Sequence, residues 1–357
     1  MKRPAVAIVI PGGIGTGKNN IGVPVLNGLV KIMSAQFDLT VFQLYKVNEN
    51  YKAEGFELVE ARRLTFPFVF NKHHKKKNFV AVHGFWAIPT GLLAVIVGKL
   101  FGVKSVVSVL GGDGVGLPEI NYGRLHRPLL RWLTLLTLRN ATHINALTRY
   151  LVNNLKAVGF NRPMEVIPWG VDRDMFDYHP KAIGAVVRFI HVANFHPVKD
   201  QETLLRAFEI INNRIPSELI MLGTGVDHQK VTDLIARSGL QKSVKILDPI
   251  PYEHLPAIYH GADVLLHTSL SEGQCEVVTE AMSCGLPVCG TRVGLMHDLP
   301  DCCVAVDVRD YATLAEETIK LLGDPERMNE LRMRAHQWTT HHDILWTAER
   351  LMTIYRS

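Results

Sequence analysis

The sequence predicts an α/β protein of two doubly wound domains, because strand and helix patterns alternate along the chain and the alternation starts again near its middle. Apolar runs of strand length are followed by amphipathic stretches of helical period. In the first half the expected strands are 5–10, 39–44, 79–83, 105–110 and 143–147, and the expected helices are 23–33, 89–101, 125–138 and 150–158. Strands this rich in Val, Ile and Leu are typical of a parallel sheet covered on both faces.

The second half repeats this organisation after a polar stretch, residues 174–184, which lacks periodicity and is expected to be an interdomain linker. We therefore expect domains at 1–173 and 174–340. The expected strands are 187–192, 218–222, 244–246, 263–268, one beginning near 288, and 303–306; the expected helices are 202–211, 230–238, 255–261, one from about 277 to Gly285, 311–322, 325–338 and 344–355.

Composition is that of an ordinary globular protein. The chain has 357 residues, 47% of them apolar and 20% charged, which is enough for two domains. A formal net charge of +5 suits an anionic substrate or an anionic membrane surface. Because no basic stripe is interleaved with aromatic residues, nucleic acid is not expected as a partner.

The cysteines argue against a metal site and for a reducing compartment. All five lie between Cys275 and Cys303, in an odd number and without a CxxC pair. We expect free thiols, no metal ligand set and a cytoplasmic location. The apolar region 88–110 is interrupted by two lysines and a glycine, so it predicts a helix and a strand rather than a membrane span.

The stretch 262–291 is the most informative about function, since it predicts a buried strand, a loop and then a helix. Such a helix points its N-terminal N–H groups at the carboxyl end of the strand, where an anion can bind. Glu272 and Glu280 flank this end, and Gly273 allows close approach of a ligand. Carboxylates accept hydrogen bonds from hydroxyl groups but repel phosphates. A ligand that suits both the helix end and the two carboxylates carries a phosphate and several hydroxyls, as a nucleotide sugar does. Glu276 is expected to be a surface residue.

The same stretch resembles a known signature. Ser-Glu-Gly at 271–273, followed by Glu-Ala-Met-Ser-Cys-Gly-Leu-Pro-Val at 280–288, is similar to the Glu-x7-Glu motif of retaining glycosyltransferases of family 4. The resemblance covers roughly residues 79–355. It implies the GT-B architecture, two Rossmann-like domains facing across a cleft, with a final helix at 341–357 packing back on the first domain. It also implies that Glu272 contacts the donor sugar and Glu280 the ribose.

Further donor contacts are expected from three loops of the second half. Residues 193–200 resemble the family's Gly-Arg-Leu-x-Pro-x-Lys-Gly, in which Lys199 matches the diphosphate-binding lysine and Asn194 replaces the arginine. A lysine at a helix N-terminus opposes the helix dipole, which favours a functional reason for it. The remaining expected contacts are Gly223 of a Gly-x-Gly turn, Gly273, Gln274 and Cys275.

The glycine-rich turn after the first strand, residues 12–19, is close to the phosphate-loop motif G-x4-G-K-[ST]. Asn19 stands where a hydroxyl should follow Lys18, so we expect instead that Gly13 and Gly15 face the donor diphosphate or the acceptor. Residues 108–113 resemble the family's Thr-x-His-Gly-x-Asp loop, but Leu110 replaces the histidine. Asp113 is expected either to accept a substrate hydroxyl or to stabilise the turn.

Two basic segments raise the question of a membrane surface. Residues 71–77 form a dense basic run, and Arg124, Arg127 and Arg131 accompany a leucine-rich helical pattern. Both could contact an anionic leaflet, in which case the protein is peripheral on the inner face of the membrane. A solvated loop and a core-packed helix are the alternatives. His83, at a strand end, is expected to bind substrate or to be bonded within the fold.

Together these observations lead us to expect a retaining, metal-independent hexosyltransferase without a cofactor. It would move a sugar from a nucleotide-diphosphate donor to a glycan or lipid-linked acceptor, in polysaccharide, lipopolysaccharide or glycolipid biosynthesis. Three alternatives stay open: a nucleotide-sugar epimerase or phosphorylase, a P-loop-like nucleotide-binding protein resting on Lys18, and an inactive carbohydrate-binding relative.

Overall fold

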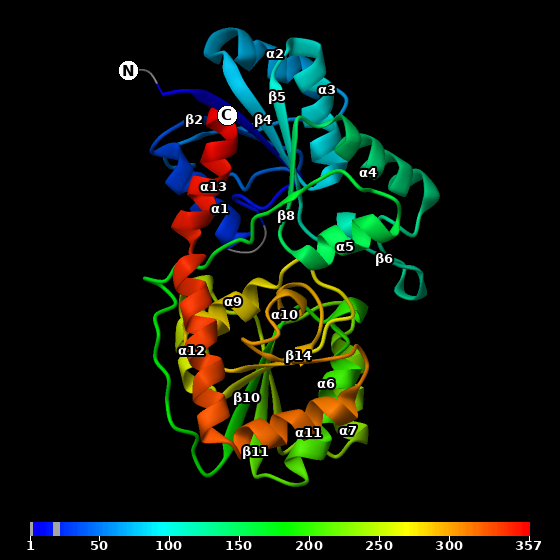
Figure 1. Cartoon of the computed structure of the whole chain (residues 1–357), viewed down its shortest axis with the longest axis vertical. Coiled ribbons are helices and arrows are strands. Elements are labelled where there is room, and N and C mark those ends of the chain that lie inside the picture. Colours follow the sequence, from blue (N-terminus) through cyan, green and yellow to red (C-terminus); the bar gives the residue numbers. More distant parts are fainter. Residues whose placement is uncertain (1–2, 17–21) are drawn as a thin grey trace. The chain divides into compact units, whose positions relative to one another are not determined.

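The structure, a computed structural model, describes residues 3–16 and 22–357. The chain divides into two compact units: unit 1 is Met1–Gly170 with Ile344–Ser357, and unit 2 is Val171–Asp343 (Figure 1). The polar stretch expected as a linker belongs to unit 2, because Phe176 is buried there and its carbonyl accepts a 2.6 Å hydrogen bond from the Ser283 hydroxyl. Lys18 and Asn19 lie outside the described residues.

Unit 1 is built on a seven-stranded parallel sheet with helices on both faces. Its strands, in spatial order, are β3 (Glu57–Glu60), β2 (Asp38–Gln43), β1 (Ala5–Ile10), β4 (Phe79–Phe85), β5 (Lys104–Val109), β8 (His143–Ala146) and β9 (Glu165–Val166). Its helices are α1 (Pro24–Ser34), α2 (Phe66–Lys77), α3 (Leu92–Phe101), α4 (Pro128–Asn140), α5 (Arg149–Ala157) and α13 (Ile344–Arg356). A short antiparallel pair, β6 (Gly116–Leu117) and β7 (Tyr122–Gly123), stands apart from the sheet.

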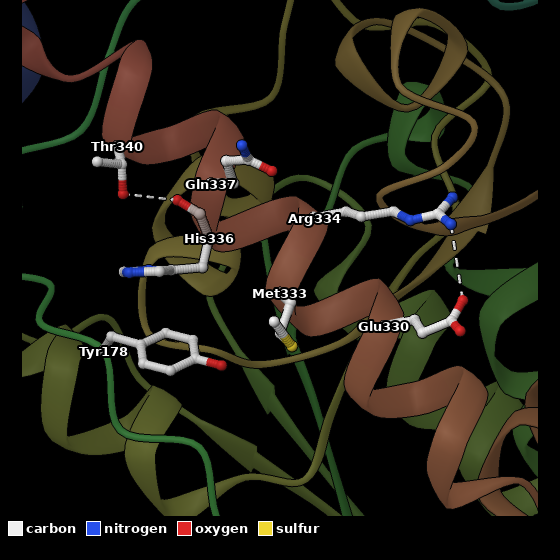
Figure 2. Close-up of a pocket in the computed structure, with 7 residues that line it drawn as sticks. All are labelled: Tyr178, Glu330, Met333, Arg334, His336, Gln337 and Thr340. Atoms are coloured by element: carbon white, nitrogen blue, oxygen red, sulfur yellow. Dashed lines mark hydrogen bonds and ion pairs between the residues drawn. The ribbon is translucent and has the colours of Figure 1, made fainter.

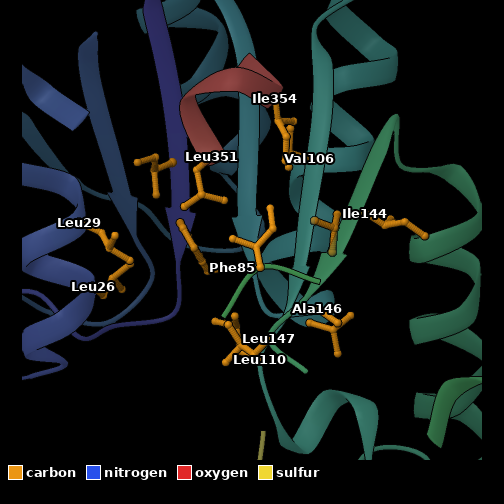
Figure 3. Close-up of a cluster of buried hydrophobic side chains, with 14 of the residues drawn as sticks. Leu26, Leu29, Phe85, Val106, Leu110, Ile144, Ala146, Leu147, Leu351 and Ile354 are labelled. Carbon is orange, nitrogen blue, oxygen red and sulfur yellow. The ribbon is translucent and has the colours of Figure 1, made fainter. Parts of the chain in front are cut away.

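The β1 strand shows why the sheet is covered on both faces. Its alternate side chains point to opposite sides, so Val6, Ile8 and Ile10 belong to one apolar cluster. Ala5, Ala7 and Val9 belong to another. The first cluster also contains Leu351 and Ile354 of α13, which Figure 3 shows beside the strands.

Helix α13 is held in unit 1 by packing and by polar contacts. Leu351 and Tyr355 are buried, and Trp346 packs against the same cluster. His83 is bonded within the fold: its Nδ1 lies 2.7 Å from the Tyr355 hydroxyl and its Nε2 2.7 Å from the Ser108 hydroxyl. Burial lowers the pKa of His83 to about 3, so the ring is neutral and serves the structure.

Unit 2 has the same construction around a six-stranded parallel sheet. In spatial order the strands are β12 (Val244–Leu247), β11 (Ser217–Leu222), β10 (Val187–Val192), β13 (Val264–His267), β14 (Val288–Thr291) and β15 (Val304–Val306). The helices are α6 (Gln201–Asn212), α7 (His228–Arg237), α8 (Leu255–Gly261), α9 (Glu276–Ser283), α10 (Leu295–Asp298), α11 (Tyr311–Leu322) and α12 (Pro325–His341).

The basic run 71–77 is helical, which corrects the alternative of a solvated loop. It forms the end of α2, where the Lys77 ammonium lies 2.9 Å from carboxylate oxygens of both Asp38 and Glu57. Positive side chains near a helix C-terminus also complement its dipole. None of the helices within the described residues combines the length and apolar character needed to cross a bilayer.

Candidate functional site

The sheet of unit 2 predicts where a ligand binds. From β10 the chain continues to β11 on one side, whereas β13 pairs with β10 on the other side. Ligands of open α/β sheets bind at the carboxyl ends of two such strands, where the strand order reverses. The loop after β10 carries Lys199 and the loop after β13 carries Glu272, so the two residues chosen from the sequence lie at this position.

The two loops are bonded to each other. The Leu270 amide donates to the Val198 carbonyl at 2.8 Å, and the Thr268 hydroxyl donates to the Asp200 carbonyl at 3.0 Å. The Lys199 ammonium contacts the Glu272 carboxylate with an N–O distance of 2.5 Å. This ion pair joins residues far apart in the sequence into one site.

Glu272 has two further partners, one on its own loop and one at the end of β13. Its Oε1 also accepts a 2.6 Å bond from the Ser269 hydroxyl and lies 3.0 Å from His267 Nε2. Burial alone would raise the pKa of Glu272, but Lys199 and His267 reverse this and hold it well below its usual range. Burial lowers the pKa of Lys199, and the Glu272 charge more than compensates, so the ammonium stays charged. The site thus holds a fixed cation beside a fixed carboxylate.

Helix α9 begins directly after this loop and has no side-chain cap at its N-terminus. The residue before the helix is Cys275, a non-glycine residue with φ of 82°, in a region that side chains rarely adopt. Gln274 is buried, and its side-chain amide donates to the Thr279 hydroxyl at 3.1 Å while its carbonyl accepts from Leu295. Gly273 is also buried. The N-terminus is therefore rigidly placed beside the Lys199–Glu272 pair.

Glu280 is buried, with only 3% of its surface exposed. Its Oε1 accepts from the Tyr252 hydroxyl at 2.9 Å and its Oε2 from the Tyr259 hydroxyl at 2.8 Å. Burial raises the pKa of Glu280 to about 7, although the two tyrosines oppose the shift. Each carboxylate oxygen still has a free lone pair for a ligand hydroxyl.

Glu276, expected at the surface, is only partly exposed. Its side chain is half-buried at the start of α9, and burial raises the pKa of its carboxyl while a hydrogen bond from its own backbone N–H opposes this. A carboxylate at the first helical position is favoured by the helix dipole. Glu276 thus occupies the end of the helix at which an anionic ligand was expected.

The remaining expected contacts lie in the neighbouring loops. Gly223 follows β11 with φ of 153°, and a Cβ there would come within 1.9 Å of the Ala193 carbonyl oxygen, so only glycine fits. Asn194 is exposed, and its carbonyl accepts from Gln201 at 3.3 Å. Both belong to the loops around Lys199.

Two clusters among the described residues have metal-ligand chemistry. His267, Glu272 and Cys275 offer ligand atoms within 4.8 Å of one another, as do Asp177, His179 and His260 at the surface. In the first cluster the Lys199 ammonium bonds Glu272 Oε1, and its charge opposes a cation. The arrangement therefore favours an ion pair over a metal centre at Glu272.

The expected residues of the first half belong to unit 1. Gly13 and Gly15 lie in the loop after β1 with φ of 114° and 59°, and their carbonyls accept from Val23 and Asn48. Leu110 is buried in an apolar cluster, so this loop has no general base at the position where the family has histidine. Asp113 is 3% exposed and accepts from the amides of Ala87 (2.8 Å), Gly111 (2.9 Å) and Leu110.

These three bonds make Asp113 an anchor between two loops of unit 1. Burial raises the pKa of its carboxyl while the backbone amides oppose the shift. The structure thus places Asp113 in the turn-stabilising role, and a substrate contact of its remaining lone pairs stays a prediction.

A separate cavity of unit 2, of about 720 Å³, lies along α12 (Figure 2). The Tyr178 ring stands opposite His336, with ring centroids 4.0 Å apart. Tyr178 also packs on Gly285, where a Cβ would meet its ring at 2.8 Å. Gly285 follows the C-terminus of α9, so this cavity lies at the opposite end of that helix from Glu272.

Sequence reasoning missed four residues of the unit 2 site: His267, Ser269, Tyr252 and Tyr259. The two tyrosines precede Glu280 in the chain by 28 and 21 residues, so no local pattern connects them. His267 ends the buried strand β13, and a histidine at a strand end was a usable signal.

Comparison with known proteins identifies the class. The chain superposes on a sucrose-phosphate synthase from Thermosynechococcus elongatus with a TM-score of 0.82 and 18% identity, over 99% of this chain and 98% of that one. It superposes on the Anabaena protein HepE, in complex with UDP and glucose, with a TM-score of 0.81 and 16% identity, over 99% and 100% of the two chains. The expected fold is confirmed: this is a protein of the GT-B glycosyltransferase fold.

The family follows from the sequence. Residues 184–338 match the model of glycosyl transferases group 1, and residues 49–170 match that of the glycosyl transferase 4-like domain. The chain is 24% identical to the N-acetyl-alpha-D-glucosaminyl L-malate synthase of Bacillus anthracis, over 74% of this chain and 70% of that protein. Five more relatives, 25–31% identical, align over 46–48% of this chain and 39–42% of their own length. The chain belongs to the group 1 glycosyltransferases, as its Glu-x7-Glu motif indicated.

Proposed function

We propose that this enzyme transfers a hexose-type sugar from a nucleotide-diphosphate sugar to a hydroxyl of a glycan or lipid-linked acceptor, with retention at the anomeric carbon and without a metal or other cofactor. Unit 2 binds the donor and unit 1 the acceptor. The observation that carries the proposal is the Lys199–Glu272 pair at the carboxyl ends of β10 and β13, where the strand order reverses. The complex of HepE with UDP and glucose supports a donor of this kind.

Each group of the site has a role in this reaction. The Lys199 ammonium stabilises the charge that develops on the departing diphosphate. Glu272 accepts a hydrogen bond from a hydroxyl of the donor sugar, and Glu280 accepts hydrogen bonds from the ribose hydroxyls. Because the Lys199–Glu272 ion pair is already formed in the protein, its charges need little reorganisation when the diphosphate departs.

The proton of the acceptor needs a base, and Leu110 cannot supply one. A front-face displacement solves this. The bond between the anomeric carbon and the phosphate oxygen breaks, and the acceptor oxygen bonds to the same face of that carbon. The acceptor proton moves to the departing phosphate oxygen. Retention of configuration follows because attack and departure share one face.

A panel of nucleotide sugars tests the proposal. We expect one donor to raise the unfolding temperature of the protein and to be hydrolysed slowly without acceptor, because a ligand that binds only the folded state stabilises it by mass action. The activity should persist in EDTA. In NMR spectra the sugar released by hydrolysis should first appear with the same anomeric configuration as in the donor. Release of the opposite anomer, or a requirement for Mg²⁺, would contradict the corresponding part of the proposal.

The same panel separates the alternatives. Conversion of one nucleotide sugar into another without acceptor would indicate an epimerase. Binding of Mg²⁺-ATP that is lost in Lys18→Ala would indicate a P-loop protein. Donor binding without hydrolysis or transfer would indicate an inactive carbohydrate-binding relative.

We also propose that unit 1 contacts anionic membranes from the inner face. On α4, Leu129 and Trp132 lie one turn apart with 66% and 56% of their surfaces exposed. On α2, Lys72, Lys75 and Lys76 are exposed, whereas Lys77 is used within the fold. Apolar and basic side chains together are what an anionic interface binds.

Vesicle sedimentation checks this contact. We expect the protein to sediment with vesicles containing 30 mol% phosphatidylglycerol and not with pure phosphatidylcholine, and the Leu129→Ser/Trp132→Ser variant to lose most of the bound fraction. Leu345→Ser is the matched control, because Leu345 is 60% exposed on α13. Equal sedimentation of both variants would exclude α4 as the contact.

A further inference from the structure

Unit 1 contains a cavity of about 440 Å³ that the donor site does not use. Its lining residues include Arg63, Arg124, Arg127, Trp86 and Tyr122. These residues come from three separated segments: the loop before α2, the end of β4, and the segment from β7 to α4. Their convergence is therefore a product of the fold and not of one local motif.

The position of this cavity in the sheet is that of a ligand site. The chain passes from β1 to β2 and β3 on one side, and β4 pairs with β1 on the other side, so the strand order reverses between β1 and β4. Pro11, which follows β1 directly, and Trp86, which follows β4 directly, both line the cavity. Unit 1 thus places a cavity at the point where open α/β sheets bind ligands.

The three arginines of this cavity form no ion pair with a described carboxylate. Among residues 3–16 and 22–357, no carboxylate lies within ion-pair distance of Arg63, Arg124 or Arg127, although many other arginines of the chain have such partners. The one carboxylate in the lining is Asp113, and its two oxygens accept from backbone amides of the loops they join. Three guanidinium groups around one cavity are suited to a carboxylate or phosphate, which they bind with paired hydrogen bonds.

Two of the lining residues, Arg127 and Trp86, are held by hydrogen bonds. Arg127 Nη2 donates to the Asn121 side-chain oxygen at 2.8 Å, which sets the direction of its guanidinium. Trp86 has φ of 69°. Its backbone N–H donates to the Ser108 carbonyl at 2.9 Å, and its carbonyl accepts from the Gly91 amide at 2.9 Å. A tryptophan held in this sparsely populated conformation offers a rigid face for the apolar side of a sugar or polyol.

We infer that this cavity is the acceptor site and that the acceptor carries an anionic group, a carboxylate or a phosphate monoester, bound by Arg63, Arg124 and Arg127. The inference rests on the proposed function, in which unit 1 binds the acceptor, and it names the chemical class of that acceptor. A neutral sugar lacks the group that these arginines select and is a poor acceptor.

Titration of the full chain with inorganic phosphate, in saturating UDP, tests the inference. UDP occupies the diphosphate position in unit 2, so the remaining phosphate binding reports on unit 1. We expect weak, salt-sensitive binding in the wild type, about tenfold weaker binding for each Arg→Gln replacement at positions 63, 124 and 127, and none detectable in the triple variant. Arg62→Gln is the matched control, because Arg62 is exposed beside Arg63 but does not line the cavity.

Two further arms identify the source of the anion. Glycerol phosphate and malate represent soluble acceptors, and phosphatidylcholine vesicles with 20 mol% phosphatidic acid represent a lipid headgroup. Binding in either arm that depends on the three arginines supports the inference and shows the source. With the donor found in the panel above, transfer to an anionic acceptor should exceed transfer to its neutral analogue at least tenfold, and the triple variant should abolish this preference.

Unchanged phosphate affinity in a folded triple variant, or equal transfer to neutral and anionic acceptors, would overturn the inference. Failure of the proposed function has a different result: UDP and nucleotide sugars would not bind, whereas the effect of the arginine replacements on phosphate binding would remain measurable. Arg127→Lys should recover part of the affinity, because it restores the charge without the paired geometry.

Discussion

Replacing Lys199 by alanine is expected to lower kcat/KM for sugar transfer by about 100-fold or more, because the group that stabilises the departing diphosphate is removed. The variant should also lose on the order of 3 kcal/mol of folding free energy. Its partner Glu272, whose side chain is 12% exposed, would then be a buried carboxylate without a cation. Steady-state kinetics and urea unfolding measure the two effects separately.

Two further variants show whether the activity loss is merely a loss of stability. In Lys199→Met/Glu272→Gln both charges are gone, so stability should recover while transfer stays low. Lys181→Ala is the matched control, because Lys181 also pairs with a buried carboxylate of unit 2, Asp263, at 3.1 Å. It should lose stability and keep its kcat/KM. Near-normal transfer by a folded Lys199→Ala variant would refute the role of Lys199.

The main parts of both sheets were predictable because their strands are nearly continuous apolar runs. Ala5–Ile10 occurs as expected, since every residue of such a run can be buried on one face or the other. Val187–Val192 also occurs as expected, although Arg188 within it is exposed. The edge strand Glu57–Glu60 was missed for the opposite reason: it is mostly solvent-facing and carries charge at both ends. Helix α2 was missed because the charge of its last turn obscured the buried Phe66 and Phe70.

The site was predictable in its parts but not in its pairing. Lys199 and Glu272 could each be chosen from a loop after a strand, because the carboxyl ends of parallel strands collect ligand contacts. That they contact each other depends on β10 and β13 being neighbours, which only the sheet order establishes. The grouping of the three arginines of unit 1 was not predicted: Arg124 and Arg127 were considered for a membrane-facing or core-packed helix, although both precede α4, and no pattern singled out Arg63.

Replacing Glu280 by glutamine is expected to stabilise the protein at pH 8. Folding raises the pKa of this carboxyl from 4.5 to about 7, so the folded state binds the proton more tightly than the unfolded state. Below pH 4.5 the carboxyl is protonated in both states and does not destabilise the fold. As the pH rises from 4.5 to about 7, its ionisation lowers the free energy of unfolding progressively. The glutamine variant should gain on the order of 2–3 kcal/mol over the wild type at pH 8. Urea unfolding at pH 8 should show this gain, and unfolding at pH 4.5 should show little difference, since the amide can pair with Tyr252 and Tyr259 as a protonated carboxyl does.

The same substitution should weaken UDP binding, which identifies the reason for keeping a destabilising charge. If the carboxylate accepts the ribose hydroxyls, losing its charge should raise the Kd for UDP about 10- to 100-fold at pH 8. Calorimetry with 2′-deoxy- and 3′-deoxy-UDP provides the decisive comparison: the wild type should discriminate against the analogue that lacks the contacted hydroxyl, and Glu280→Gln should discriminate much less. If wild type and variant bind UDP and both analogues equally, Glu280 only pairs with Tyr252 and Tyr259 and does not contact the nucleotide. If Glu280→Gln instead gains stability and loses selectivity between UDP and its deoxy analogues, the buried carboxylate destabilises the fold and serves to bind the nucleotide.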